Sequence, residues 1–224
     1  MAQWWQQSAN PTFNNPRQRD IFCFAALKTQ NMPLLEALTG KEPMNQNLAE
    51  ELVTMMAEDQ RLLQQLFDSG ELPWGSYHLR MKALHEQNAS RLKEIISAHG
   101  WPGVSLVGAE GAKAAWLVVQ HSVSDPEFMG ECVSLLEDAV AREDVAGWQL
   151  AFLQDRMHTL AGKPQYYGTQ FDIDENGWPT PFPIEDSATV NERRARLGLN
   201  SIEERQEQMT EQERKRRANI EQSS

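Results

Sequence analysis

The chain has 224 residues, of which 40% are hydrophobic and 24% are charged, so it can form one folded domain with appendages. Its formal net charge of −11 argues against general nucleic-acid binding, because a diffuse acidic surface repels phosphate groups. No run of about 18 apolar residues occurs, and the N-terminus lacks a secretory signal, so we expect a cytoplasmic protein without a membrane span.

Residues 1–43 are predicted to form an N-terminal arm with a short helix at 17–30. The first 16 residues contain two Pro, three Asn and no charge, which is typical of a loose segment. Cys23 and Cys132 both lie in apolar surroundings, and we expect buried free thiols in a reducing compartment.

Two long helices are predicted at 45–68 and 76–98. The first has apolar residues at spacings of three and four, interrupted by Asp59-Gln60-Arg61, and Gly70 follows its end. The second ends at Gly100-Trp101-Pro102, where Gly and Pro stop a helix.

The segment 109–121 is predicted to be the buried central helix, because every residue from Ala114 to Val119 is apolar. Helices at 126–142 and 145–161 follow. Asp125 is suited to be the N-cap of the first, with Pro126 at its first helical position.

Beyond Pro164 the sequence favours a small hairpin near 165–184, with its turn at Asn176-Gly177. Tyr166 to Ile173 suit its first strand. A short helix at 187–197 and a charged helical tail at 201–224 complete the chain, with only Ile202 and Met209 of the tail expected inside. The predicted fold class is therefore mainly α: a bundle of about five to seven helices in one domain over 44–200, with a small C-terminal β-hairpin.

Gln120 and His121 end the predicted buried helix. The helix dipole favours a charged imidazole and burial favours a neutral one, so His121 suits acid/base chemistry near neutral pH. The alternative is a histidine that hydrogen-bonds the last helical carbonyls. Asp125 is interpreted as an N-cap, with orientation of His121 as its alternative role.

Asp155-Arg156 lies at the edge of an apolar helix face, and Arg156 is suited to hold a carboxylate or phosphate. Two separate structural ion pairs explain these residues equally well.

The segment 165–170, Gln-Tyr-Tyr-Gly-Thr-Gln, offers amides, phenols and a hydroxyl to a polar ligand, or is an ordinary hairpin strand with a Gly bulge. We expect no cofactor and no dedicated metal site, because His78 and His85 are too far apart for an i,i+4 pair and no Cys cluster exists. A mixed His/Asp site assembled by folding stays open.

Several short motifs, taken together in their order, resemble a bacterial family known as domain of unknown function 6624. The resemblance covers roughly 48–200 and rests on Gly100-Trp101-Pro102, Ala115-Trp116-Leu117, Gln120-His121, Asp125-Pro126-Glu127-Phe128, Leu153-Gln154-Asp155-Arg156, Tyr167-Gly168-Thr169-Gln170, Pro183-Ile184-Glu185-Asp186 and Asn191-Glu192-Arg193-Arg194. Asp59-Gln60-Arg61 also looks like a family feature. The resemblance implies no settled activity. At His85 the family pattern leads us to expect Asp, and His85 is not included in the predicted site.

Two hypotheses follow. In the first, the protein is a cofactor-free enzyme, a hydrolase or transferase, acting on a small polar or anionic ligand. Its catalytic residues would be His121, Asp155, which orients His121, and Arg156, and its substrate-binding residues would be Trp116, Gln120, Gln165, Tyr167, Thr169 and Gln170. In the second, it is a non-catalytic binding, immunity or regulatory module for a basic protein partner, and the same polar residues form a structural hydrogen-bond network.

Overall fold

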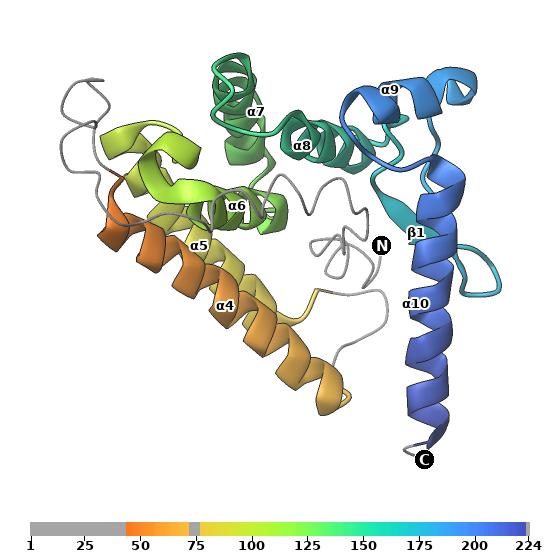
Figure 1. Cartoon of the computed structure of the whole chain (residues 1–224). Coiled ribbons are helices and arrows are strands. Elements are labelled where there is room, and N and C mark those ends of the chain that lie inside the picture. Colours follow the sequence, from red (N-terminus) through yellow and green to blue (C-terminus); the bar gives the residue numbers. More distant parts are fainter. Residues whose placement is uncertain (1–43, 72–76, 223–224) are drawn as a thin grey trace, which may run out of the picture.

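The computed structural model describes residues 44–71 and 77–222, and in these ranges the chain forms seven α-helices and one two-stranded sheet (Figure 1). The predicted mainly α fold with a small C-terminal hairpin is therefore confirmed. The predicted N-terminal arm, its short helix and Cys23 lie outside the described residues.

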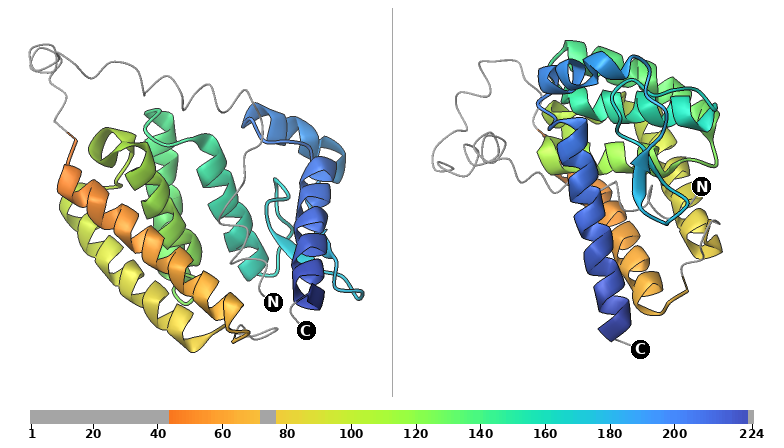
Figure 2. Two further views of the ribbon diagram at one scale, coloured as in Figure 1. Left: turned by 60° about the horizontal axis from the view of Figure 1, so that its bottom comes forward. Right: turned by 90° about the vertical axis from the view of Figure 1, so that its right-hand side faces the viewer.

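Helices α4 (Gln46–Asp68) and α5 (Leu79–His99) lie side by side, and α6 (Val104–His121) packs across both of them (Figures 1 and 2). Asn45 caps α4 by accepting a hydrogen bond from the Leu48 backbone nitrogen. Leu52 and Leu66 of α4 and Leu92 of α5 are fully buried in the interior. The apolar faces of α4, α5 and α6 pack together around these residues.

Helix α6 is the buried central helix that its apolar sequence predicts, and all residues from Ala114 to His121 are buried. A short helical turn from Val104 precedes the predicted helix, and the two are separated by a kink at Gly108, where the backbone is not helical (φ 69°, ψ 173°). At Gly111 an added Cβ would lie 3.4 Å from the Cα of Ala49, so the small residue lets α4 approach closely.

Helices α7 (Pro126–Ala141) and α8 (Gly147–Leu160) pack against each other and cover α6 (Figure 1). Asp125 caps α7 as predicted, since its side chain accepts from the Phe128 nitrogen and Pro126 follows. Cys132 is a buried free thiol.

The hairpin consists of β1 (Phe171–Ile173) and β2 (Pro179–Pro181), paired antiparallel with Phe171 opposite Pro181. The first strand is shorter than predicted. Residues 166–169 are not strand, because their backbone amides turn toward α8 instead of pairing with a neighbouring strand.

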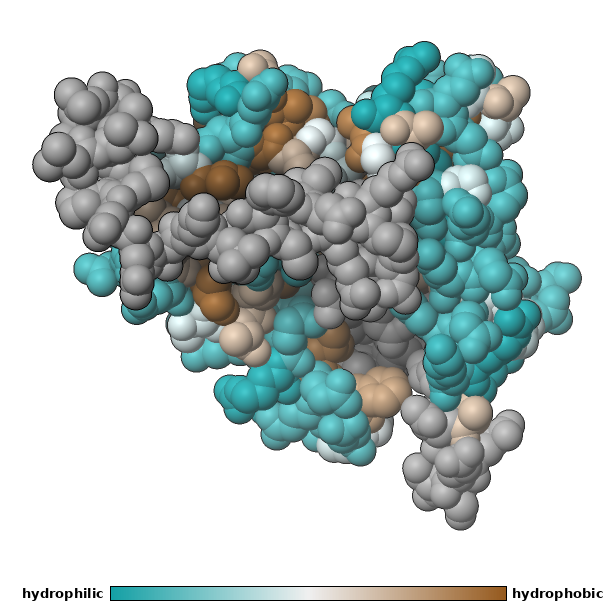
Figure 3. All heavy atoms as spheres, viewed as in Figure 1, coloured by the Kyte–Doolittle hydropathy of each residue, from teal (hydrophilic) through white to brown (hydrophobic). Residues whose placement is uncertain are grey.

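A short 3₁₀ turn (Ser187–Thr189), helix α9 (Val190–Arg196) and helix α10 (Ile202–Gln222) complete the chain. Helix α10 packs along β2, with Met209 against Phe171, and Figure 3 shows its outer surface as largely hydrophilic. More of this helix is inside than the sequence predicts, since Arg205 and Glu213 are also buried. Within the described ranges, no helix combines the length and apolar character needed to cross a bilayer.

Candidate functional site

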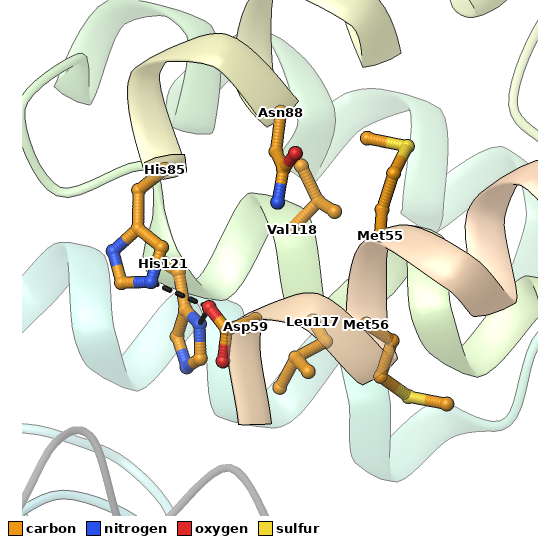
Figure 4. Close-up of a pocket in the computed structure, with 8 residues that line it drawn as sticks. All are labelled: Met55, Met56, Asp59, His85, Asn88, Leu117, Val118 and His121. Atoms are coloured by element: carbon orange, nitrogen blue, oxygen red, sulfur yellow. Dashed lines mark hydrogen bonds and ion pairs between the residues drawn. The ribbon is translucent and has the colours of Figure 1, made fainter. Parts of the chain in front are cut away.

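Three side chains from three different helices meet in the interior: Asp59 of α4, His85 of α5 and His121 of α6 (Figure 4). The Oδ2 atom of Asp59 lies 2.5 Å from Nε2 of His85 and 2.8 Å from Nδ1 of His121. All three residues are at most 3% exposed. We call these three residues the Asp59 cluster.

The cluster forms because each residue occupies a core position of its helix. Asp59 follows buried Leu52 and Met55 at helical spacing, and His85 lies between buried Met81 and Leu92 in the same way. A polar side chain on such a face needs a polar partner, because burial removes its water. The partners are 26 and 62 residues from Asp59 in sequence, so only the tertiary fold brings them together.

Further polar contacts hold the cluster in one orientation. The hydroxyl of Tyr77 hydrogen-bonds Nδ1 of His85, which leaves Nε2 facing Asp59. The side-chain amide of Gln60 donates to Oδ1 of Asp59 at 3.0 Å. Around the cluster lie the apolar side chains of Met55, Met56, Leu117 and Val118 (Figure 4).

The electrostatics of the cluster favour a charged carboxylate and a neutral His85. Burial by itself would raise the pKa of Asp59, but the charge of His121 and the hydrogen bonds from both histidines outweigh it, so this pKa is below its ordinary value. Burial lowers the pKa of His85, despite the hydrogen bond to Asp59. Burial also raises the pKa of the Tyr77 hydroxyl, which therefore remains protonated.

A surface cavity of about 190 Å³ gives access to the two histidines. Its wall includes His85, His121, Ser90, Ser122 and Lys93. Lys93 forms an ion pair with Asp125 at 2.6 Å on the same wall. The imidazoles thus separate a buried carboxylate from a small polar opening.

Asp155 does not occupy the position that the sequence predicts for it, since the carboxylate at His121 is that of Asp59. The Asp155 carboxylate accepts hydrogen bonds from the backbone nitrogens of Tyr166, Tyr167 and Thr169 and from the Thr169 hydroxyl, at 2.7–3.1 Å. Burial raises the pKa of Asp155, although these hydrogen bonds act to lower it. Asp155 therefore fixes the loop 165–170 on α8.

The buried side chain of Arg156, only 3% exposed, donates hydrogen bonds to groups of the protein itself. Its Nη1 donates to the carbonyl of Gln120 at 2.7 Å, and its Nε donates to Oε1 of Gln170 at 3.0 Å. Burial lowers the pKa of its guanidinium to about 10. Arg156 thereby ties the end of α6, where His121 stands, to the loop 165–170.

The loop carries the remaining predicted binding residues and is closed by internal hydrogen bonds. The amide of Gln165 donates to the carbonyls of Gln170 and Phe182. Gln170 donates in turn to the Thr169 hydroxyl. From α9, Arg194 donates to the carbonyl of Tyr167 at 2.6 Å. In this part of the predicted site, these polar groups hydrogen-bond to one another and to α9.

Trp116 and Gln120 lie inside the protein. Trp116 is 0% exposed, donates to the Gln149 carbonyl at 2.9 Å and packs edge-on against Trp148 and Phe152, so it belongs to the core. Neither polar atom of the Gln120 side chain has a hydrogen-bond partner within the described part of the chain, although the residue is only 1% exposed.

Of the predicted catalytic residues, the structure places only His121 in the cluster. The other two members, Asp59 and His85, are not among the residues that the sequence predicts for the site, and neither is Tyr77, which contacts His85. The sequence signal that marks Asp59 and His85 is a polar residue on an otherwise apolar helix face. The mixed His/Asp arrangement that the sequence left open is the one group of potential metal ligands found among the described residues.

Comparison with known proteins gives one match. The model of the family described as "Family of unknown function (DUF6624)" matches residues 46–213, which include the Asp59 cluster, Asp155, Arg156 and the loop 165–170. Neither the curated proteins nor the solved structures include one that matches this chain.

Proposed function

We propose that the chain, which belongs to the DUF6624 family, is an enzyme that hydrolyses or transfers a group on a small polar or anionic substrate at the Asp59 cluster. One observation carries this proposal: two imidazoles from separate helices contact one oxygen of a buried carboxylate beside an open cavity.

The cost of this arrangement supports a functional role. A carboxylate and two imidazoles in a core lose their hydration, and well-packed apolar residues of similar size are often equally or more stabilising. Most of the side chains around the cluster are apolar, so apolar residues would be the ordinary occupants of these positions. Strongly coupled buried titratable groups beside a cavity are typical of catalytic sites.

The cluster offers two related kinds of chemistry. An imidazole paired with a carboxylate can accept and return a proton, because the carboxylate stabilises the imidazolium that forms. The same nitrogen and oxygen atoms can also hold a metal ion that activates water. Both lead to hydrolysis or group transfer.

The cavity suits a small substrate. Its volume of about 190 Å³ is below the range of roughly 300–1,000 Å³ for drug-sized ligands. The hydroxyls of Ser90 and Ser124 on its wall suit a polar group, and Lys93 supplies a positive charge that it shares with Asp125. This region takes the place of the loop 165–170 as the proposed binding surface.

A second candidate is a non-catalytic binding, immunity or regulatory module for a basic protein. The closed network of Asp155, Arg156 and the loop 165–170 favours it, because these residues satisfy one another. The net charge of −11 would suit a basic partner.

The test is a screen of ester, phosphoester and amide substrates with the wild type and with Asp59→Asn, His85→Gln and His121→Gln. We expect each variant to lower kcat/KM by at least about 100-fold, as loss of a positioned acid/base group does. His99→Gln is the matched control, because His99 is exposed at the end of the same helix as His85. Folded variants with undiminished activity would contradict the proposal, and a protein inactive toward every class would favour the second candidate.

A further inference from the structure

The three donor atoms of the Asp59 cluster have the spacing and chemistry of a metal site. We propose that Asp59, His85 and His121 bind one divalent transition-metal ion, Zn²⁺ or an ion of similar chemistry. This inference rests on the proposed function, because it places the ion at the proposed active site. The ligand atoms would be a carboxylate oxygen of Asp59, Nε2 of His85 and Nδ1 of His121.

The distances require only a small adjustment. The candidate ligand atoms all lie within 4.8 Å of one another. Metal–ligand bonds of about 2.0–2.2 Å place neighbouring ligand atoms roughly 3–3.5 Å apart. The present separations of 2.5 and 2.8 Å from the Asp59 oxygen are somewhat shorter, so this carboxylate would move away from both imidazoles to admit the ion.

The ligand types select a class of metal. Two imidazole nitrogens and one carboxylate suit Zn²⁺, Fe²⁺, Co²⁺ or Mn²⁺, and sets of two His and one carboxylate recur in catalytic sites. Mg²⁺ and Ca²⁺ prefer oxygen ligands, and only one of these three residues supplies oxygen. We therefore expect selection against both of these ions.

The charge at the site also calls for a cation. The Asp59 carboxylate is buried among methionine and leucine side chains, and its ion-pair partners in the described ranges are the two histidines, with no Lys or Arg. A bound dication would balance this carboxylate without a proton on either imidazole, since a neutral imidazole is the form that binds metal.

Contacts outside the three ligands fix their orientation. Nδ1 of His85 is held by Tyr77 and Oδ1 of Asp59 by Gln60. Metal-bound histidines almost always have such a partner on the other ring nitrogen, and it sets which nitrogen faces the metal. The backbone at His121 is positioned by Arg156, which binds the Gln120 carbonyl.

The cavity reaches the rings of His85 and His121 but not Asp59, so water would reach the ion only between these two imidazoles. A metal with three protein ligands would keep a coordination position for that water. Bound water loses its proton to solvent far more easily than bulk water does. This would give the proposed enzyme a hydroxide nucleophile.

The test is direct metal binding by the purified full chain. After treatment with a chelator and dialysis, Zn²⁺ binding is titrated by calorimetry, and Co²⁺ is added to record the visible absorption of a low-symmetry site. We expect one ion per chain. Asp59→Asn and His85→Gln should weaken Zn²⁺ binding by more than about 100-fold, and Tyr77→Phe by about 10- to 100-fold. His99→Gln should bind like the wild type.

The outcomes separate this inference from the proposed function. Folded wild type that binds no Zn²⁺ or Co²⁺, or folded Asp59→Asn and His85→Gln variants that bind them normally, would overturn the metal site. Activity that survives treatment with the chelator would support the proposed enzyme and contradict a role for the metal in it. Stoichiometric binding without activity toward any substrate would support the metal site and count against the enzyme. If a variant fails to fold, the wild-type titration and its Co²⁺ spectrum decide.

Discussion

Two buried aspartates in this protein have contrasting environments, and the contrast assigns their roles. Asp155 is surrounded by backbone N–H groups of one loop, whereas Asp59 is contacted by two imidazoles from other helices. The Asp155 carboxylate is engaged by the loop that it holds, so we expect its role to be structural. An imidazole can accept and donate a proton, because its neutral and charged forms interconvert near neutral pH.

Replacement of Asp155 should therefore affect stability first. Asp155→Ala leaves three backbone N–H groups without their acceptor, and each buried orphan costs about 1–3 kcal/mol. We expect the free energy of unfolding to fall by at least about 3 kcal/mol in urea denaturation, and by less in Asp155→Asn, which keeps an acceptor oxygen. Asp138→Asn, at an exposed position of α7, is the control and should change little. A loss below 1 kcal/mol in Asp155→Ala would show that the loop is held by other contacts.

His85 should make the metal-free protein less stable in mild acid. Its folded-state pKa is lowered by burial from the ordinary 6.5, so below about pH 6.5 the unfolded state binds more protons than the folded state. The free energy of unfolding should thus decrease as the pH falls from 7 to 5. The His85→Gln variant should have a flatter profile in chelator-treated protein, measured by urea denaturation at each pH. Parallel profiles for the two proteins would contradict a neutral buried His85.

At the scale of elements, the loop 165–170 depends on one glycine for its path. Gly168 has φ of +65°, and a Cβ there would lie 2.7 Å from Ile202 and 2.9 Å from Ile184. Gly162 also has positive φ, but an added Cβ meets nothing within 4 Å. A side chain at Gly162 would meet backbone strain alone, whereas one at Gly168 would meet both strain and crowding.

We expect Gly162→Ala to cost about 1–2 kcal/mol, because the left-handed conformation disfavours a side chain. Gly168→Ala should cost more than this, since strain and overlap with the isoleucines add. Thermal unfolding of both variants measures the difference. Equal losses would mean that Ile202 and Ile184 move aside at no cost.

The sequence predicted elements where the local pattern determines the structure. The continuous apolar run at Ala114–Val119 predicts a buried helix, and Asp125-Pro126 predicts a helix start, and both are found. The failure at 166–169 has a physical reason. Aromatic and polar alternation favours a strand, but the Asp155 carboxylate offers these amides a better set of acceptors.

The candidate site was predictable only in part. His121 is visible because a histidine ends an apolar helix, and Asp59 interrupts an apolar stripe. The contact between them cannot be predicted from the sequence, because 62 residues separate them and several helix packings would bury the same apolar stripes. Asp155 is predicted instead because it belongs to the family-like motif Leu153-Gln154-Asp155-Arg156 at the edge of an apolar helix face. His85 was set aside on the family pattern, although its position between Met81 and Leu92 marks a core face.

At the scale of the whole molecule, the Asp59 cluster joins α4, α5 and α6 at one point. A ligand that binds only the folded protein stabilises it by about 2.7 kcal/mol when its concentration is a hundred times Kd. Zn²⁺ should thus raise the Tm of the wild type by roughly 5–10 °C, since about 1 kcal/mol shifts Tm by 2–4 °C at this chain length. Differential scanning fluorimetry measures the shift. Mg²⁺ and the Asp59→Asn variant serve as controls and should give no comparable increase.

The most direct measurement is anomalous X-ray diffraction from crystals grown with Zn²⁺, recorded on both sides of the zinc absorption edge. The proposed site predicts one strong anomalous peak at about 2.0–2.2 Å from Nε2 of His85, Nδ1 of His121 and a carboxylate oxygen of Asp59. A map with no peak there, and with both imidazoles still hydrogen-bonded to Asp59, would contradict the metal centre.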